Sequence, residues 1–428
     1  MMQDSSGIPN GEPESAVGPG VELGPTGSPA GADRAAHPAG GDRAAHPAGP
    51  RFAAMPAGWD TLPRAEGGRM PFERALVIRF GRIGDMLVLT PALRALHRAH
   101  PAGSIDVLTS RDGEIALGGN PHVRDVLVFR RRRLPPLVNV ERARLLRVLR
   151  HRRYDVVFLF ETAERYRRLA RAIGVQQVFS FARDDEDASS TLAVRRPDRH
   201  EGLRFLDVIA LAGIPPDGVH YDFAIAADAR QRAARTLREA GIPDDAPIAG
   251  IHAGHFQRRR RSRPHAKAWP VARYAAVVHG LRDRGVHVVL TGSSAERTLN
   301  ERILAALDSG EAVPPATGGA ASVIDISGRT DLATLAAIID RCAVFVAPDT
   351  GPAHLAAAVG TPVVALFGPK APYIMGPLGD PARIVRLHPE PSPAPDRDRD
   401  HYHPRMWAIG VQDVLGAVDA LLLRARQV

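Results

Sequence analysis

Three polar positions in this sequence carry side chains that can move a proton or hold an anion. Asp85 stands just after the apolar segment 75–80, the turn Asp349-Thr350-Gly351 follows the apolar segment 344–348, and Lys267 closes an arginine-rich loop. A carboxylate at the end of a strand can take a proton from a hydroxyl group. Its simpler interpretation is stabilisation of the helix that begins there, which contributes roughly 0.3–1 kcal/mol. Spacing alone leaves both interpretations open.

The turn at residues 349–351 is predicted to form an anion site. It joins an apolar strand to an Ala-rich helix, and Pro352 suits the first position of that helix. Free N–H groups and the positive end of the helix dipole then face the crevice at the carboxyl end of the strand. The pattern leaves the chemical identity of the anion open.

The loop that precedes Lys267 suggests a phosphate clamp. Gly254 follows the apolar segment 248–253 and lets a ligand approach the backbone, and His255 can donate to an anion. Residues 257–263 then contain five arginines. Only two of the 56 basic residues are lysines, so a retained lysine marks a place where a compact ammonium group is useful. A solvated basic loop is the alternative interpretation.

Composition narrows the class of protein. The net charge is +9, and residues 1–70 contain eight acidic and five basic residues, so the remainder carries +12. A basic surface suits a phosphorylated substrate, an anionic membrane or nucleic acid, but the basic segments 130–133 and 257–263 lack the interleaved aromatic residues of single-strand binding. No apolar segment is long enough to span a membrane, no secretory signal is visible and Cys342 is the only cysteine. We therefore expect a cytoplasmic protein.

The order of apolar and polar segments predicts two α/β domains. Residues 1–70 are rich in Gly, Pro and Ala and are expected to be a disordered tail. From about residue 72 to 243, short apolar strands alternate with helical segments, and the pattern resumes from 244. Such alternation is typical of a doubly wound parallel sheet. The first turn, at residues 81–85, lacks the third glycine of a dinucleotide fingerprint, and the sequence contains no Walker or zinc-ligand pattern.

Taken together, three segments resemble glycosyltransferase family 9, the ADP-heptose:lipopolysaccharide heptosyltransferases. Residues 76–85, LVIRFGRIGD, with the nearby TPAL at 90–93, resemble its amino-terminal motif. The segment 267–270, KAWP, resembles its Lys-x-Trp-Pro element. Residues 349–358, DTGPAHLAAA, with LFGP at 366–369, resemble its carboxyl-terminal signature. The order and spacing of all three agree with the family.

The resemblance implies a GT-B fold, in which two Rossmann-like doubly wound domains face a central cleft. The implied parts are an acceptor domain at 72–243, a nucleotide-sugar domain at 244–408, and a last helix at 409–428 that packs back toward the first domain. The implied activity is inverting transfer of a heptose from ADP-heptose to the lipopolysaccharide inner core. Neither a cofactor nor a metal is expected. The implied partners are the donor, a phosphorylated glycolipid acceptor and the anionic surface of the inner membrane, and no nucleic acid.

The resemblance also assigns residue roles. Asp85 matches the base and Lys267 the positive charge that assists catalysis, and the donor is held by residues that come mostly from the second domain. The implied donor contacts are Glu296, Asp349, Thr350, Gly351 and His354, with Glu296 at the ribose. Gly254 and His255 are added as donor contacts from the residues themselves. Gly254-His255 and the arginine-rich loop depart from the family pattern, since many members carry small hydroxyl residues ahead of the lysine. The alternatives are a relative that uses another nucleotide sugar or acceptor, and a nucleotide-sugar-binding module that has lost catalysis.

Overall fold

The computed structural model describes Gly58 and residues 60–65, 67–129, 140–182, 191–193, 196–254, 266–308, 321–392 and 402–425. All of them belong to one compact unit that begins at Ala48. The tail predicted at residues 1–70, the arginines at 130–133, His255 and the arginines at 257–263 lie wholly or mostly outside the described residues. Among the described residues, no helix is long and apolar enough to cross a membrane.

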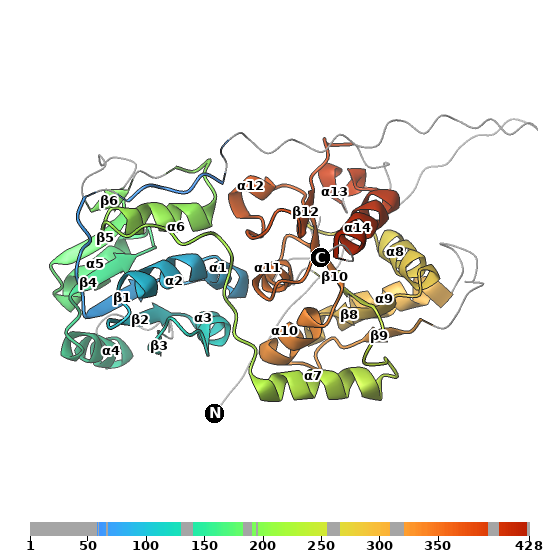
Figure 1. Ribbon diagram of the computed structural model, residues 1–428, viewed down its shortest axis with the longest axis horizontal. Coiled ribbons are helices and arrows are strands. Elements are labelled where there is room, and N and C mark those ends of the chain that lie inside the picture. The colour runs from blue at the N-terminus through green and yellow to red at the C-terminus, as the bar shows by residue number, and fades with distance from the viewer. Residues whose placement is uncertain are drawn as a thin grey trace, which may run out of the picture. The chain divides into compact units, whose positions relative to one another are not determined.

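The first half of the chain forms a six-stranded parallel sheet with the order β3-β2-β1-β4-β5-β6 (Figure 1). Its strands are β1 Arg74–Ile78, β2 Ser104–Thr109, β3 Asp125–Val128, β4 Val156–Leu159, β5 Gln177–Phe181 and β6 Leu192–Ala193. Its helices are α1 Ile83–Leu87, α2 Thr90–Ala99, α3 Arg111–Leu117, α4 Val140–His151, α5 Glu164–Ile173 and α6 Glu201–Ala210.

The second half forms another six-stranded parallel sheet, with the order β12-β11-β10-β7-β8-β9. Its strands are β7 Ile248–His252, β8 His287–Thr291, β9 Val323–Asp325, β10 Val344–Pro348, β11 Val363–Leu366 and β12 Ile384–Leu387. The helices of this half are α7 Ala227–Glu239, α8 Val271–Asp283, the short 3-10 helix Ser294–Glu296, α9 Arg297–Asp308, α10 Leu332–Asp340, α11 Gly351–Ala358, α12 Pro372–Met375, α13 Pro404–Ala408 and α14 Val411–Ala425.

The two sheets share one topology, because each strand order reverses beside the first strand of its own half. In the first sheet β1 pairs with both β2 and β4, and in the second sheet β7 pairs with both β8 and β10. Ligands of open α/β sheets bind beyond the carboxyl ends of the strands at such a switch point. The structure confirms the predicted α/β fold of two doubly wound domains, and the segments after β1, β7 and β10 are where a site is expected.

Both sheets are buried on their two faces, which explains why their central strands read as continuous apolar sequence. Every residue of β7 and of β10 is buried, as are the last four residues of β1. The apolar segments of the sequence therefore predicted these strands nearly to the residue. Cys342, which precedes β10, is a buried free thiol, and burial raises its pKa to about 12.

Helices α7 and α14 lie at the two ends of the predicted nucleotide-sugar domain, and both pack against elements of the second half. Helix α7 packs against α10, although it precedes residue 244, where the nucleotide-sugar domain was predicted to begin. The buried residues of α14, Val414, Leu415, Val418 and Leu421, lie in the core built on β7, β8, β10 and α8. The buried face of α14 packs against α8 in the core of the second domain, and its packing back toward the first domain stays a prediction.

Arg94 in α2 is buried with 2% of its side chain exposed, and it ties this helix to the segment that leaves the first domain. Its Nε atom lies 3.1 Å from Asp217 Oδ2, and its Nη1 atom is paired with Asp222. Nη1 and Nη2 also donate to the carbonyl oxygens of His220 and Asp217, both at 2.9 Å. Thr90 in the same helix accepts a hydrogen bond from the Asp222 backbone N–H at 2.9 Å. The TPAL segment of the sequence therefore anchors this connection.

We predict that Arg94→Met destabilises the protein by about 2–4 kcal/mol, because breaking a buried ion pair leaves charges without a partner. The value lies toward the lower end of the range for such changes, since Asp217 and Asp222 keep part of their solvent contact. Urea denaturation followed by circular dichroism measures the change. Arg98→Ala is the matched control: Arg98 also pairs with Asp217 but is 64% exposed, so its loss should cost less than about 1 kcal/mol. Equal effects of the two substitutions would contradict this account.

Candidate active site

Asp85 is the third residue of the short helix α1, which begins soon after β1 ends. Its Oδ2 atom accepts a hydrogen bond from the Arg82 backbone N–H at 2.9 Å, so the carboxylate stabilises the start of its own helix. A side chain at Gly81 would place its Cβ atom 2.6 Å from Asp85 Cβ, which leaves room only for glycine. The capping role predicted from the sequence is therefore present, and it holds the carboxylate at the carboxyl edge of the first sheet.

Helix α1 packs against α11 of the second domain (Figure 1). A Cβ atom added at Gly84 would lie 3.2 Å from His354 Cδ2 and 3.3 Å from Gly351 Cα. The backbone beside Asp85 thus lies against the turn that follows β10. The structure brings Asp85 together with the turn 349–351 and His354, which lie more than 260 positions later in the sequence.

Lys267 lies at this turn. Its Nζ atom donates to the Asp349 carbonyl oxygen at 2.6 Å and lies 2.6 Å from Asp349 Oδ2. Asp349 Oδ2 makes no well-directed hydrogen bond within the described residues, so its contact with Lys267 is an ion pair set by charge and distance. An ammonium group has three N–H donors. Because one of them donates to the Asp349 carbonyl oxygen, Lys267 keeps N–H donors for a ligand.

The N-terminus of α11 is open to an anion. Thr350 occupies its N-cap position, but the Thr350 side chain does not cap the helix. Its Oγ1 atom donates instead to the Pro348 carbonyl oxygen at 3.0 Å. Pro352 has no N–H, and the Ala353 N–H donates to the Thr350 carbonyl oxygen at 3.1 Å. The start of α11 therefore offers an anion the Gly351 N–H and the positive end of the helix dipole. The anion site at this turn stays a prediction.

His354 in the first turn of α11 is buried, and burial lowers the pKa of its imidazole even though Asp349 and Asp85 act in the opposite direction. The ring is therefore neutral near pH 7. Its Nδ1 atom has no hydrogen-bond partner among the described residues. A neutral imidazole with a free nitrogen between two carboxylates can bind a hydroxyl or an oxyanion without adding a full charge.

Glu296 and Gly254 lie together beyond β7 and β8. Glu296 Oε2 accepts from the Ser293 backbone N–H at 2.7 Å and from Ser293 Oγ at 2.9 Å. Glu296 Oε1 lies 3.9 Å from His252 Nε2. A Cβ atom at Gly254 would come within 2.6 Å of Glu296 Cδ. Gly254 thus makes room for the Glu296 carboxylate, and the approach of a ligand to the Gly254 backbone stays a prediction.

Sequence reasoning missed two contacts between the domains. His200 Nδ1 accepts from the Gly202 backbone N–H at 3.1 Å, so its proton is on Nε2, which donates to the Gly376 carbonyl oxygen at 2.8 Å. Burial lowers the pKa of His200 to about 3, which keeps it neutral. Tyr221 Oη accepts from the Leu378 backbone N–H at 3.0 Å. The available signal was the position of His200 directly before a predicted helix, where a side chain can act as a cap.

His255 lies outside the described residues, so its predicted donor contact stays a prediction. Among the described residues, no group of three or more His, Cys, Asp or Glu side chains is arranged to hold a metal ion. The charged groups described around the α1–α11 contact include Asp85, Lys267, Asp349 and Arg386. They offer a carboxylate on one side and an ammonium group with a helix N-terminus on the other.

Two doubly wound domains whose switch-point turns meet define a glycosyltransferase fold of the GT-B type. In agreement, the chain superimposes on a crystal structure of Escherichia coli ADP-heptose lipopolysaccharide heptosyltransferase II with a TM-score of 0.64 and 22% identity. The match covers 82% of this chain and 99% of that one.

Residues 142–403 match the model of glycosyltransferase family 9 (heptosyltransferase), and the chain belongs to this family. It is 35% identical over 160 residues to lipopolysaccharide heptosyltransferase 2 of E. coli K12, a match that spans 37% of this chain and 44% of that relative. It is 26% identical over 296 residues to lipopolysaccharide heptosyltransferase 3 of E. coli, across 67% of this chain and 80% of the relative. The family resemblance inferred from the three sequence segments is confirmed.

Proposed function

We propose that this protein transfers a heptose from ADP-heptose to the lipopolysaccharide inner core with inversion, and that Asp85 is the base. The observation that carries the proposal is the contact between α1 and α11, which sets Asp85 beside the turn that pairs with Lys267. Inverting transfer needs a base on the acceptor oxygen and positive charge at the departing diphosphate. The two requirements are met on the two sides of this contact.

The chemical step follows from these positions. The Asp85 carboxylate takes the proton of an acceptor hydroxyl group while the hydroxyl oxygen forms a bond to the anomeric carbon of the donor. The bond between that carbon and the diphosphate breaks on the opposite face, and the electron pair leaves with the diphosphate. Lys267, the Gly351 N–H and the positive end of the α11 dipole stabilise the new negative charge. This supply of positive charge lets the reaction proceed without a metal ion or a cofactor.

The rest of the donor is assigned to the second domain. The heptosyltransferase structure of the same fold is described as an ADP-heptose enzyme, which supports ADP as the nucleotide. Glu296 lies at the carboxyl edge of the second sheet beyond β8, where a carboxylate can accept hydrogen bonds from ribose hydroxyls. Its Oε2 atom is held by Ser293, so Oε1 is the atom assigned to the ribose.

We predict that Asp85→Asn lowers kcat about 10²- to 10⁴-fold, because an amide cannot accept the proton. ADP affinity should change by less than about threefold, since the carboxylate does not hold the leaving group. Transfer of heptose from ADP-heptose to a heptose-free core glycolipid measures kcat, and calorimetry measures ADP binding. Asp349→Asn serves as the contrasting variant, because it disturbs the partner of Lys267 and should change ADP affinity. Unchanged turnover in Asp85→Asn would remove Asp85 from the role of base.

We predict that Lys267→Met weakens ADP binding about 10- to 100-fold, as expected for loss of a hydrogen bond to a charged group. Lys370→Met is the matched control, since Lys370 is the other lysine of the chain and is exposed. Calorimetry measures the ADP affinity of both variants with and without EDTA, and EDTA should change neither affinity. If Lys267→Met binds ADP as tightly as the unsubstituted protein, the diphosphate assignment fails. Failure to bind ADP at all would favour a different nucleotide sugar.

We further propose that α4 lies on an anionic inner-membrane surface from the cytoplasmic side, where the glycolipid acceptor is presented. Its exposed side chains include Arg144, Arg147 and Arg150, and the two valines Val140 and Val148 are 57% and 43% exposed. Basic residues interspersed with exposed apolar ones suit a peripheral contact with acidic lipid.

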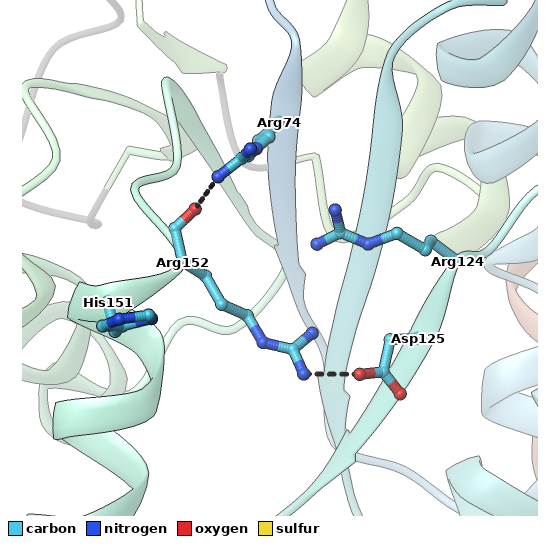
Figure 2. A pocket seen from close by; sticks show the side chains of 5 residues that line it. All are labelled: Arg74, Arg124, Asp125, His151 and Arg152. Carbon is cyan, nitrogen blue, oxygen red and sulfur yellow. Dashed lines mark hydrogen bonds and ion pairs between the residues drawn. The ribbon is translucent and has the colours of Figure 1, made fainter.

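A cavity of about 430 Å³ adjoins the end of α4, where His151 is one of its lining residues (Figure 2). It is lined by Arg74, Arg124, Asp125, His151 and Arg152. Part of the charge is already paired, since Arg124 and Arg152 both contact the buried Asp106 and Arg152 also contacts Asp125 at 2.5 Å. We therefore expect this cavity to contribute only part of the positive potential of the surface around α4.

We predict that the protein sediments with vesicles containing phosphatidylglycerol and that 0.5 M NaCl releases it, because salt screens surface charge. The double substitution Arg144→Glu with Arg147→Glu should lower vesicle binding about tenfold or more, at about 1 kcal/mol per basic residue. Arg302→Glu in α9, also exposed, is the control and should bind as the unsubstituted protein does. Equal binding to neutral and anionic vesicles would contradict the proposal.

A further inference from the structure

A small cavity lies in the first domain where β1, β4 and β5 end and α6 begins. Its volume is about 100 Å³. The polar lining comes from Arg79, Glu161, Thr162, Glu201 and Arg204, and three phenylalanine rings complete the wall. None of these residues belongs to the donor-binding side described above.

The charged residues of this cavity form a connected network centred on Arg79. Arg79 Nη2 donates to Glu201 Oε1 at 2.6 Å, and Nη1 donates to the Phe160 carbonyl oxygen at 3.2 Å and lies 3.5 Å from Glu161 Oε1. The same Glu161 oxygen accepts from the Phe80 backbone N–H at 2.8 Å. Arg79 Nε is buried and has no hydrogen-bond partner among the described residues.

The balance of charge indicates the kind of ligand. Two arginines face two glutamates, so the cavity has no net charge to attract an anion or a cation. Buried charged groups exclude a purely apolar ligand, because they would lose their hydrogen bonds to solvent. Carboxylates accept from hydroxyl groups, guanidinium groups donate to them, and aromatic rings cover carbon-bound hydrogens. A neutral, hydroxylated carbon chain or ring edge fits all three conditions.

The cavity lies on the acceptor side of the active site. Arg79 stands two residues before Gly81, where an added Cβ atom would lie 2.6 Å from Asp85 Cβ. Glu201 follows His200, which reaches the second domain at Gly376. The cavity and Asp85 therefore both lie at the carboxyl edge of the first sheet, whereas the predicted anion site belongs to the second domain.

We propose that this cavity binds a hydroxylated arm of the acceptor sugar, and that Glu161, Arg79 and Thr162 determine which acceptor is used. The inference rests on the proposed transferase function, since it assigns the cavity to the acceptor of that reaction. At about 100 Å³ the cavity holds a polyol arm or one edge of a sugar. The remainder of the acceptor lies outside it, toward Asp85.

The kinetic test uses two variants that affect the cavity differently. Thr162→Ile removes a hydroxyl group and fills space, and Glu161→Gln removes a charged acceptor but retains an oxygen for the Phe80 N–H. Each should raise the acceptor KM about tenfold or more, while ADP affinity and the KM for ADP-heptose stay within about twofold. Thr162→Ser keeps the hydroxyl group without filling space and should restore the acceptor KM. An unchanged acceptor KM in both variants would overturn the proposal.

A direct binding test separates this inference from the transferase proposal. Saturation-transfer NMR detects glycerol, a minimal hydroxylated probe, on the full-length protein without donor. We expect a glycerol signal that Thr162→Ile abolishes, that Thr162→Ser retains, and that survives Asp85→Asn. This outcome would support the assignment of the cavity to a hydroxylated ligand even if the protein transfers no heptose. A glycerol signal equal in Thr162→Ile and the unsubstituted protein, or no signal at all, would overturn the assignment.

Discussion

The site depends on the close approach of two helix N-termini, α1 from the first domain and α11 from the second. The approach is possible because glycine occupies both contact positions: Gly84 lies against Gly351 and His354, and a side chain at Gly84 would come within 3.3 Å of them. Two helix N-termini that face each other bring together the positive ends of two dipoles. Asp85 and Asp349 place carboxylates at these ends and offset the repulsion.

This electrostatic requirement reconciles two interpretations of Asp85. A carboxylate that caps α1 through one oxygen is held in place by the Arg82 N–H. Holding it there also fixes its distance from the turn after β10, where the ammonium group of Lys267 lies. The capping bond is thus the means by which the fold positions the proposed base. His354 adds no charge to this crowded region, since burial lowers its pKa and keeps the ring neutral near pH 7.

The sequence was most informative where one segment contains both the strand and the functional turn. The apolar run 344–348 and the turn that follows it predicted β10 and the start of α11 correctly, because a buried parallel strand is apolar throughout. Contacts between distant segments were not predictable in this way. Gly254 appeared to admit a ligand, but the carboxylate beside it belongs to Glu296, more than forty residues later. Local pattern shows that space is needed at a glycine and does not show what fills it.

The sequence also does not show which charged side chains pair with one another. Lys267 was singled out because lysine is rare in this chain. Its pairing with Asp349 was not predictable, because it depends on β7 and β10 being neighbours in the sheet.

The pairing of Lys267 with Asp349 has a consequence for the proposed chemistry. Asp349 already neutralises Lys267, so an incoming diphosphate meets little net positive charge from these two side chains. The uncapped N-terminus of α11 must then contribute to anion binding, and Thr350 leaves it free by donating to Pro348 rather than accepting from the helix. Pro352 has no N–H and the Ala353 N–H already donates to the Thr350 carbonyl oxygen, so the Gly351 N–H and the dipole of α11 are the parts of this N-terminus that the proposed diphosphate site uses.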